Sequence, residues 1–309
     1  MITLQRYFAH AAAQPMVQIP HSTRAAYRVG GISFGLFGGA DMSLMLDPEL
    51  RRFATDPDSC DVQIRVEWEE DLRVPAGTPL FDSGGLWSLY EESGGYHFYF
   101  STPSLGDKPY KAAWFDREFR RGHVALYRPY FDTARPIYPM EYPLDELVMI
   151  HRLAMGEGVE VHGCGVIAPD GRGMLLTGHS GAGKSTSARL WSNHPAARVL
   201  SDDRIILRQE NGRIQMYGTP WHGDAGIAEA AQSPVDAIFV LQHGQANELR
   251  PLGVAEGAAE LLARSFVPHH SHEGLSSVLK FFHAVTSSVP CFGFSFVPDF
   301  TAVEAVCRA

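Results

Sequence analysis

The stretch GMLLTGHSGAGKSTSARLW, residues 173–191, places an apolar run, a glycine-rich turn and the start of a helix in direct succession. Within it, residues 178–185 match the pattern G-x-x-x-x-G-K-[ST], known as Walker A. Glycines let the backbone turn so that successive N–H groups surround phosphate oxygens, and the following helix N-terminus adds a partial positive charge. Because both flanks have the required strand and helix patterns, the stretch predicts a phosphate-binding loop rather than an accidental glycine-rich turn.

Two side chains of this loop have distinct predicted roles. Lys184 supplies a mobile cation for the β- and γ-phosphates of a nucleotide, and Ser185 offers a hydroxyl to Mg²⁺. ATP and Mg²⁺ are therefore the predicted cofactors. The predicted nucleotide site also includes the neighbouring residues of the loop and of the helix start, which are Gly178, His179, Ser180, Gly181, Ala182, Gly183 and Thr186.

Two adjacent carboxylates follow the next predicted strand. Asp202 and Asp203 come only 18 positions after Lys184, directly after the short apolar run RVLS. At a strand end, one carboxylate can hold Mg²⁺ while the other accepts a proton from a hydroxyl. The alternative is a solvated turn, which aspartate also favours. His162 lies on the predicted strand that precedes the strand of the phosphate loop, and a histidine in such a place is more often a packing residue with a satisfied hydrogen bond.

These elements together carry a family likeness. The runs EVHGCGVIAPDGRGMLLTGHSGAGKSTSARL, residues 160–190, and VLSDDRIIL, residues 199–207, resemble the C-terminal catalytic domain of HPr kinase/phosphorylase. The resemblance spans about residues 158–245 and implies the fold shared with phosphoenolpyruvate carboxykinase. It implies Lys184 as the catalytic lysine on phosphate, Ser185 as a metal ligand, His162 as an active-site histidine and Asp202 as the base towards a protein serine.

The chain also departs from that family. The family's Leu-Glu-x-Arg-Gly-type signature, whose glutamate holds the metal, is replaced by YGTPWHGDAGIAEAA at residues 217–231. Asp203 or Asp224 is therefore expected to hold Mg²⁺ with Ser185. The chain looks like the divergent HPr-kinase-related proteins found beside peptide-modification genes. This likeness implies a serine of a protein or peptide as the phosphoryl acceptor, and the classical relatives' hexamers imply a possible homo-oligomer.

The first half of the chain has a different character. Residues 60–70, CDVQIRVEWEE, alternate apolar and polar side chains, and residues 85–102 read as two strands around Ser93-Gly94-Gly95. A proline-containing segment, residues 133–143, then predicts a connection. We expect a β-rich N-terminal domain of unknown role over residues 1–140. A mixed-sheet α/β kinase domain of HPr kinase/phosphoenolpyruvate carboxykinase type is expected over residues 141–309.

The amino-acid composition of the chain limits the kinds of partner that we expect. The chain has 309 residues and a formal net charge of −9, which argues against a broad nucleic-acid-binding face. Its four cysteines are far apart and without metal-ligand spacing, as in reduced cytosolic proteins. No signal peptide pattern or membrane-spanning apolar run is present in the sequence, so a cytoplasmic location with no membrane partner is expected.

Several residues leave alternatives open. His269, His270 and His272 form a histidine-rich loop for which surface exposure is favoured over metal binding. Trp221 and His222 either lie at the mouth of the site or form a packed turn, and Arg204 neutralises transferred phosphate or pairs with Asp203. The predicted function is ATP- and Mg²⁺-dependent phosphoryl transfer to a hydroxyl, with a protein or peptide serine preferred. A small-molecule kinase on the same fold and a non-catalytic nucleotide-binding regulator are the alternatives.

Overall fold

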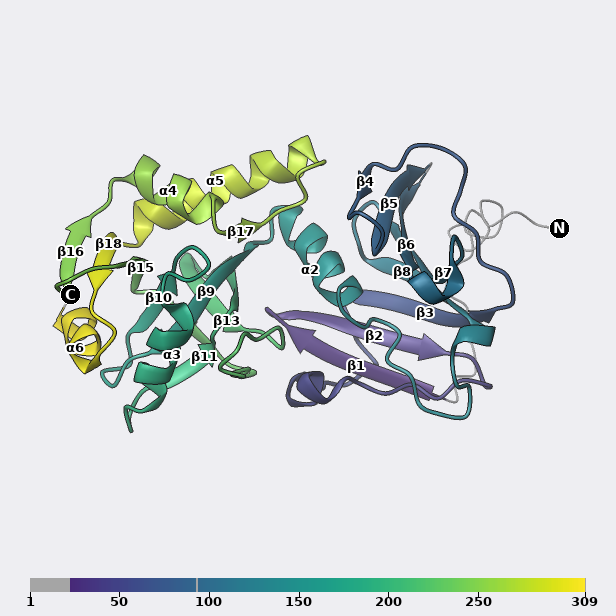
Figure 1. Cartoon of the computed structure of the whole chain (residues 1–309), viewed down its shortest axis with the longest axis horizontal. Coiled ribbons are helices and arrows are strands. Elements are labelled where there is room, and N and C mark those ends of the chain that lie inside the picture. The colour runs from purple at the N-terminus through teal and green to yellow at the C-terminus, as the bar shows by residue number, and fades with distance from the viewer. Residues whose placement is uncertain (1–22, 93, 309) are drawn as a thin grey trace. The chain divides into compact units, whose positions relative to one another are not determined.

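The structure is a computed structural model, and it describes residues 23–92 and 94–308. The chain divides into two compact units (Figure 1). The first ends at Val148 and the second begins at Met149, while the turn Val29–Gly31 is grouped with the second. In the proline-containing segment, Tyr138 and Met140 are buried and belong to the first unit. The two units thus meet at residues 148 and 149 rather than at residue 140. The division into two functional domains stays a prediction.

The first unit is built on one eight-stranded mixed sheet with the order β1-β2-β3-β8-β7-β6-β5-β4. Strand β3 pairs in parallel with β2 and β8, and the strands from β4 to β8 pair as antiparallel neighbours. Short 3-10 helices lie at Pro48–Phe53, Pro103–Leu105 and Arg128–Tyr130. The strands are β1 Thr23–Val29, β2 Ile32–Gly38, β3 Val62–Glu69, β4 Phe81–Asp82, β5 Trp87–Glu92, β6 Gly95–Ser101, β7 Pro109–Asp116 and β8 Arg121–Tyr127.

The strands of this sheet show the alternation of buried and less buried side chains that is typical of a strand. On β3, Val62, Ile64 and Val66 are all fully buried, because alternate side chains of a strand point to the same face. The two strands predicted on either side of the Ser93-Gly94-Gly95 turn are β5 and β6, which pair in antiparallel register. Ser93 itself lies outside the described residues. The prediction of a β-rich first half is therefore confirmed for the part of the chain that is described.

The second unit contains a ten-stranded mixed sheet with the order β14-β13-β12-β9-β10-β15-β18-β16, and β11 and β17 pair with β9 off this path. Its strands are β9 Val159–Ile167, β10 Gly173–Thr177, β11 Arg198–Ser201, β12 Arg204–Glu210, β13 Arg213–Gly218, β14 Gln232–Pro234, β15 Ala237–His243, β16 Glu248–Pro251, β17 Ser265–Phe266 and β18 Cys291–Phe296. The helices are α2 Leu144–Ala154, which contains the boundary between the units, α3 Lys184–Ser192, α4 Val254–Leu262, α5 His272–Ser288 and α6 Phe300–Arg308.

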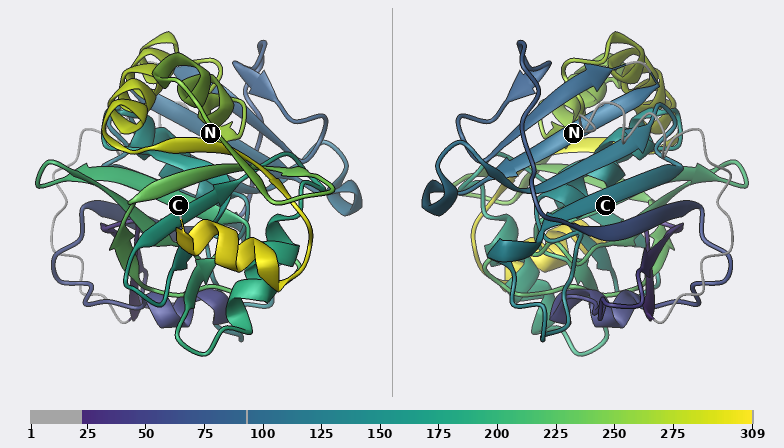
Figure 2. Two further views of the ribbon diagram at one scale, coloured as in Figure 1. Left: turned by 90° about the vertical axis from the view of Figure 1, so that its left-hand side faces the viewer. Right: turned by 90° about the vertical axis from the view of Figure 1, so that its right-hand side faces the viewer.

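Helices cover both faces of the second sheet. Leu175 of β10 packs in one apolar cluster with residues of α4 and α5, whereas Leu176 packs in another with residues of α3 and α6. The left view in Figure 2 shows the two helix pairs on opposite sides of the strands. Because both faces are buried, β10 and its parallel neighbour β15 are almost continuously apolar rather than alternating. The pairing places the part of β9 around Gly163 next to the carboxyl end of β10, where the chain turns towards the start of α3.

The pair Asn211-Gly212 between two alternating apolar runs predicts a hairpin within residues 204–218, and the structure contains it. The hairpin of β12 and β13 turns at Asn211 and Gly212, whose φ angles of 50° and 78° are those that a two-residue hairpin turn requires. The sequence did not predict the short strands β14, β16 and β17 or the helix α6. The three strands are only two to four residues long and are held by pairing with other strands, whereas α6 buries Ala302, Val303 and Val306 at a helical spacing that is visible in the sequence.

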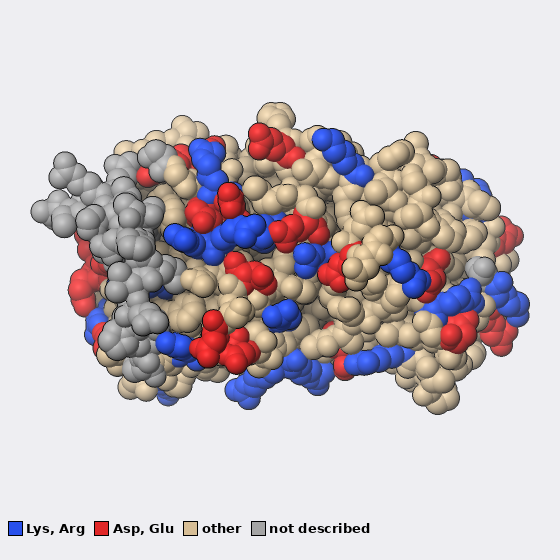
Figure 3. Space-filling model, turned by 180° about the vertical axis from the view of Figure 1, so that it is seen from behind, with Lys and Arg blue, Asp and Glu red and all other residues tan. Residues whose placement is uncertain are grey.

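The surface charge agrees with the composition. On the face drawn in Figure 3, lysine and arginine side chains lie interspersed with aspartate and glutamate rather than in one continuous basic area. Within the described residues, no helix is both long enough and apolar enough to cross a membrane.

Candidate functional site

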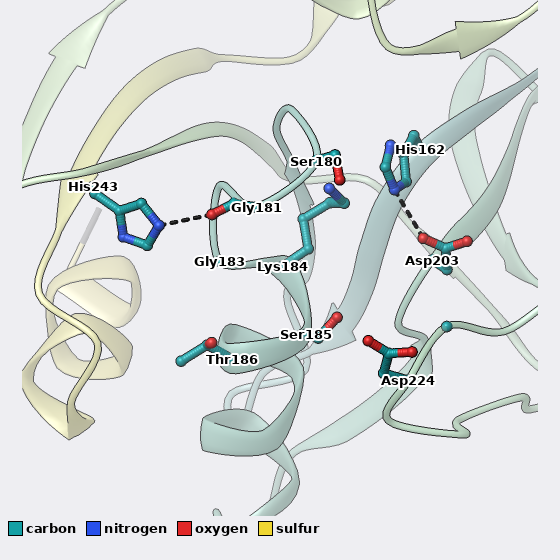
Figure 4. A pocket seen from close by; sticks show the side chains of 11 residues that line it. His162, Ser180, Gly181, Gly183, Lys184, Ser185, Thr186, Asp203, Asp224 and His243 are labelled. Atoms are coloured by element: carbon teal, nitrogen blue, oxygen red, sulfur yellow. Dashed lines mark hydrogen bonds and ion pairs between the residues drawn. The ribbon is translucent and has the colours of Figure 1, made fainter.

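The phosphate loop, residues 178–185, connects β10 to α3 (Figure 4). Gly181 and Gly183 adopt positive φ angles of 79° and 102°, a conformation that costs side-chain-bearing residues strain. Gly178 is required for space, because a Cβ there would lie 2.8 Å from Cβ of Ala182. The tight turn is closed by a hydrogen bond from the Ala182 N–H to the His179 carbonyl at 3.0 Å. The loop thus turns sharply into the N-terminus of α3, as the motif predicts.

Lys184, the first residue of α3, folds back over this loop. Its Nζ donates hydrogen bonds to the carbonyl oxygens of Gly178 at 2.9 Å and of His179 at 3.0 Å. Burial lowers the pKa of the Lys184 ammonium, the Asp203 carboxylate opposes this, and the charges of Arg264 and Arg204 add to it. The lysine is therefore a cation held against the loop backbone, with other charges of both signs nearby.

A cavity of about 410 Å³ opens in front of the loop. It brings together residues from the phosphate loop, from β9, from the end of β11 and from the loop after β13. Of the predicted site residues, Gly178, His179, Ala182 and Asp202 do not line it. The lining residues are His162, Ser180, Gly181, Gly183, Lys184, Ser185, Thr186, Asp203, Gly223, Asp224 and His243.

His162 and Asp203 form a hydrogen-bonded pair on one side of the cavity. Nε2 of His162 lies 2.8 Å from Oδ1 of Asp203 (Figure 4). The other carboxylate oxygen of Asp203 is ion-paired with Arg204. Since an ionised aspartate oxygen can only accept, Nε2 of His162 carries a proton, and in the neutral form of the ring Nδ1 is the acceptor atom. The geometry resembles a base oriented by a carboxylate.

Asp203 is ionised in this environment. Burial raises the pKa of its carboxyl group, but the hydrogen bond from His162 and the charge of Arg204 outweigh that effect, so the pKa lies below its usual value. Arg204 is in turn held by the fully buried Glu160, 3.3 Å from its Nε, and lies 4.1 Å over the ring of Phe266. Arg204 thus pairs with Asp203, one of the two roles that the sequence left open.

Asp202 points away from the cavity and is fully buried. Its two carboxylate oxygens accept backbone N–H groups from Gly223 at 3.1 Å, Ala225 at 2.8 Å and Ile227 at 3.2 Å. Consecutive side chains at a strand end diverge, so the pair Asp202-Asp203 is split between interior and cavity. The prediction that Asp202 is the base is not supported by this geometry, because its oxygens are occupied and no cavity surface reaches them.

Asp202 holds the segment of residues 219–227, the facing loop. This loop carries Gly223 and Asp224 to the cavity, opposite α3. Gly223 fits closely, since a Cβ there would lie 2.9 Å from Oδ2 of Asp202. Thr219 donates a hydrogen bond to the Arg204 carbonyl at 2.8 Å. Trp221 and His222 belong to this loop but do not line the cavity. The buried Asp202 carboxylate thus fixes the facing loop on the side that is turned away from the cavity.

A metal site can be tested against these residues. Ser185 and Asp224 point into the same part of the cavity (Figure 4). Across the described chain, no three His, Cys, Asp or Glu side chains gather as a metal-holding group. This donor set fits Mg²⁺, which is commonly bound through one or two carboxylates together with substrate phosphates and water. Both oxygens of Asp203 already have partners, which favours Asp224 over Asp203 as the metal-binding carboxylate.

The histidine-rich loop before α5 does not join this site. Nε2 of His270 lies 3.4 Å from Nε2 of His151 on α2, and the two rings are tilted against each other. Neither His269 nor His272 takes part in a metal-holding group within the described residues. His269 and His272 are exposed, as the sequence favoured, whereas His270 is half-buried against His151.

Sequence reasoning missed two residues at the site. His243, at the end of β15, places Nε2 2.7 Å from the Gly181 carbonyl and stacks on Phe296. Arg264 precedes β17 and places one guanidinium nitrogen 2.8 Å from Nε2 of His179. Both belong to elements distant in sequence from the phosphate loop, and no local motif marks either one.

Comparisons with known proteins give a partial likeness. A family model described as SynChlorMet cassette protein ScmC matches residues 140–273, which is less than half of the chain. The chain is similar to the solved structure of the Hpr(Ser) kinase/phosphatase from Coxiella burnetii, at 18% sequence identity and a TM-score of 0.29. That likeness covers 48% of this chain and 93% of that chain. No curated protein matches. A TM-score this low carries no structural weight, so the functional proposal rests on the geometry of the site.

Proposed function

We propose that this protein is an ATP- and Mg²⁺-dependent kinase that transfers the γ-phosphoryl group to a hydroxyl, with a serine of a protein or peptide as the preferred acceptor. One observation carries the proposal. A phosphate loop and a histidine–aspartate pair line a single cavity, with Lys184 between them. Phosphoryl transfer needs this combination, because catalysis depends on positioning and charge neutralisation together with a group that receives the hydroxyl proton.

The residues divide these tasks. The N–H groups of the phosphate loop and the start of α3 bind the phosphates, and Lys184 neutralises charge on the β- and γ-phosphates. Ser185 and Asp224 would hold Mg²⁺ when it is bound with the nucleotide. His162 accepts the hydroxyl proton at Nδ1, while Asp203 holds the Nε2–H and stabilises the imidazolium that forms. Asp202 contributes indirectly, through its hydrogen bonds to the facing loop.

Bound Mg·ATP supplies the phosphoryl group and the neutralising metal. The acceptor oxygen forms a bond to the γ-phosphorus, the bond from that phosphorus to the β,γ-bridging oxygen breaks, and ADP leaves. The cavity of about 410 Å³ opens to solvent, which lets an acceptor approach the phosphates from outside. The resemblance of residues 158–245 to HPr-kinase-related proteins supports serine as that side chain.

A γ-labelled ATP assay tests the proposal. Purified protein is incubated with Mg²⁺, labelled ATP and candidate precursor peptides encoded near its gene, and the label is followed. Label on peptide serine supports the proposal. Label on a metabolite supports the small-molecule kinase instead, and binding without label transfer or ATP hydrolysis supports the nucleotide-binding regulator.

Two variants examine the proposed proton acceptor. His162→Gln and Asp203→Asn should each lower the transfer rate by about 10²- to 10⁴-fold, the usual contribution of a positioned general base, with little loss of ATP affinity. His283→Gln changes an exposed histidine of α5 and serves as the control. Full activity of His162→Gln would remove the histidine from the mechanism.

A further inference from the structure

The residue between α4 and β17 contacts both halves of the proposed site. Arg264 is 7% exposed. Its backbone carbonyl accepts the N–H of His162 at 2.7 Å, which extends the antiparallel pairing of β17 with β9. Its guanidinium reaches the phosphate loop, where one nitrogen lies 2.8 Å from Nε2 of His179. A single residue therefore links the strand that carries His162 to the loop that binds phosphate.

The guanidinium of Arg264 is itself held in place. Nη1 donates to the carbonyl oxygen of Glu260 at 2.7 Å, and the Glu260 carboxylate forms an ion pair with the same nitrogen one helical turn away. The planar fork leaves Nη2 directed at His179. In the described structure the buried Nε has no hydrogen-bond partner. The guanidinium is therefore held in one orientation by Glu260, with Nη2 towards His179.

The contact fixes the chemical state of His179. A guanidinium can only donate, so Nε2 of His179 must accept, and the ring is neutral with its proton on Nδ1. The backbone carbonyl of the same histidine accepts from Lys184 and from the Ala182 N–H. Holding the His179 ring therefore restrains the first turn of the phosphate loop and the carbonyl against which Lys184 rests.

We propose that Arg264 is a positioning residue that sets the tautomer of His179 and fixes the phosphate loop relative to His162. It acts through His179 and does not line the cavity. The contact and the tautomer follow from the described geometry alone. The consequence for nucleotide binding rests on the proposed function.

The first test uses the nucleotide-free protein. Nitrogen-15 NMR of the histidine rings, with His179 assigned through His179→Gln, should show the proton on Nδ1 in the wild type. In Arg264→Ala the His179 signals should move towards a mixture of the two tautomers, because the donor is gone. The control is Arg250→Ala. It removes an exposed arginine of β16 that pairs with Glu256 of α4, and it should leave the His179 signals unchanged. Unchanged His179 signals in Arg264→Ala would overturn the proposal.

The second test is a double-mutant cycle on Mg·ATP affinity, measured by calorimetry. Arg264→Ala and His179→Ala should each weaken Mg·ATP binding about tenfold. The double variant should also lose only about tenfold, because each single substitution already breaks the same Arg264–His179 contact. Losses that multiply to about a hundredfold would show that Arg264 does not act through His179. Arg264→Lys retains charge but lacks the fork, so it should give a smaller loss and serves if Arg264→Ala does not fold.

The two tests separate this proposal from the proposed function. A tautomer change in Arg264→Ala with no ATP binding by any form would support the Arg264–His179 contact and reject the kinase. Normal ATP binding by wild type and Arg264→Ala alike, with the tautomer unchanged, would reject the positioning role while leaving the kinase standing.

Discussion

The phosphate loop and the facing loop lie on two sides of one cavity and take their shapes in different ways. The phosphate loop is shaped locally, by Gly181 and Gly183 at positive φ and by the strand and helix that directly flank it. The facing loop is shaped by Asp202, which comes from the end of β11 about 20 positions earlier in the chain and binds three of its N–H groups. One loop is encoded in a contiguous motif, and the other depends on a distant carboxylate.

The same difference explains how two neighbouring aspartates come to have different roles. Asp202 and Asp203 have the same side chain, but one is saturated by backbone donors and the other pairs with His162 at the cavity. A carboxylate that accepts several backbone N–H groups in the interior stabilises the fold, whereas a cavity carboxylate remains available to orient a reacting group. The predictions below test whether the two loops separate in this way.

Among variants of the two loops and the residues that hold them, the largest effect is expected from Lys184→Ala in the phosphate loop. Removal of the cation that rests against this loop should lower phosphoryl transfer by about 10²- to 10³-fold, the usual effect of deleting one charge-stabilising group. Single-turnover assays with labelled ATP measure it, and Lys280→Ala on the exposed face of α5 is the control. Retention of wild-type turnover in Lys184→Ala would mean that the loop is not the catalytic phosphate site.

The next largest effect is expected from Asp202→Asn and falls on stability. The amide keeps one acceptor oxygen but replaces the other with an NH2 group, which cannot accept the N–H groups that now bind that oxygen, and it also removes the charge. We therefore expect a loss of about 2–4 kcal/mol in unfolding free energy. Urea denaturation measures this loss, and hydrogen exchange should show faster exchange in residues 219–227. Asp236→Asn is a matched control, since Asp236 also accepts a backbone N–H, from Gly173. If Asp202→Asn folds normally but loses only transfer, the base role belongs to Asp202 after all.

A smaller effect distinguishes two glycines of the phosphate loop. Gly183→Ala places a Cβ 2.4 Å from the ring of Phe296 at a φ of 102°, whereas a Cβ on Gly181 meets nothing within 4 Å. Both variants incur backbone strain of about 1–2 kcal/mol. Gly183→Ala should therefore melt at a lower temperature than Gly181→Ala in calorimetric scans. Equal melting temperatures would show that Phe296 does not restrain the loop.

The smallest effect concerns pH. The folded-state pKa of Asp203 is lowered below its usual value of 3.8, so its ionised form stabilises the fold. That contribution is fully present above pH 3.8 and is lost as pH falls through the lower folded-state pKa. Denaturation between pH 6 and pH 2 should show a shallower fall in stability for Asp203→Asn than for the wild type. Identical slopes would contradict the effect of His162 and Arg204 on this carboxyl.

Local patterns predicted much of the fold. Alternation on β3, the Asn211-Gly212 turn and the strand–loop–helix around Lys184 are all present, because each is specified by residues close together in the chain. The candidate site was predicted less completely. His162, Asp203 and Asp224 do meet Lys184 at one cavity, although their roles stay predictions. Arg264 and His243 had no local signal, since each reaches the loop only through the pairing of distant strands.

By itself, the sequence determined that a glycine-rich turn joins a buried strand to a helix and offers N–H groups and a lysine to phosphate. It did so because glycine conformation, helix polarity and hydrophobic periodicity act over a few residues. Only the tertiary structure decided which aspartate faces the cavity. That choice depends on where the facing loop leaves three N–H donors without partners, and the buried carboxylate that satisfies them is Asp202.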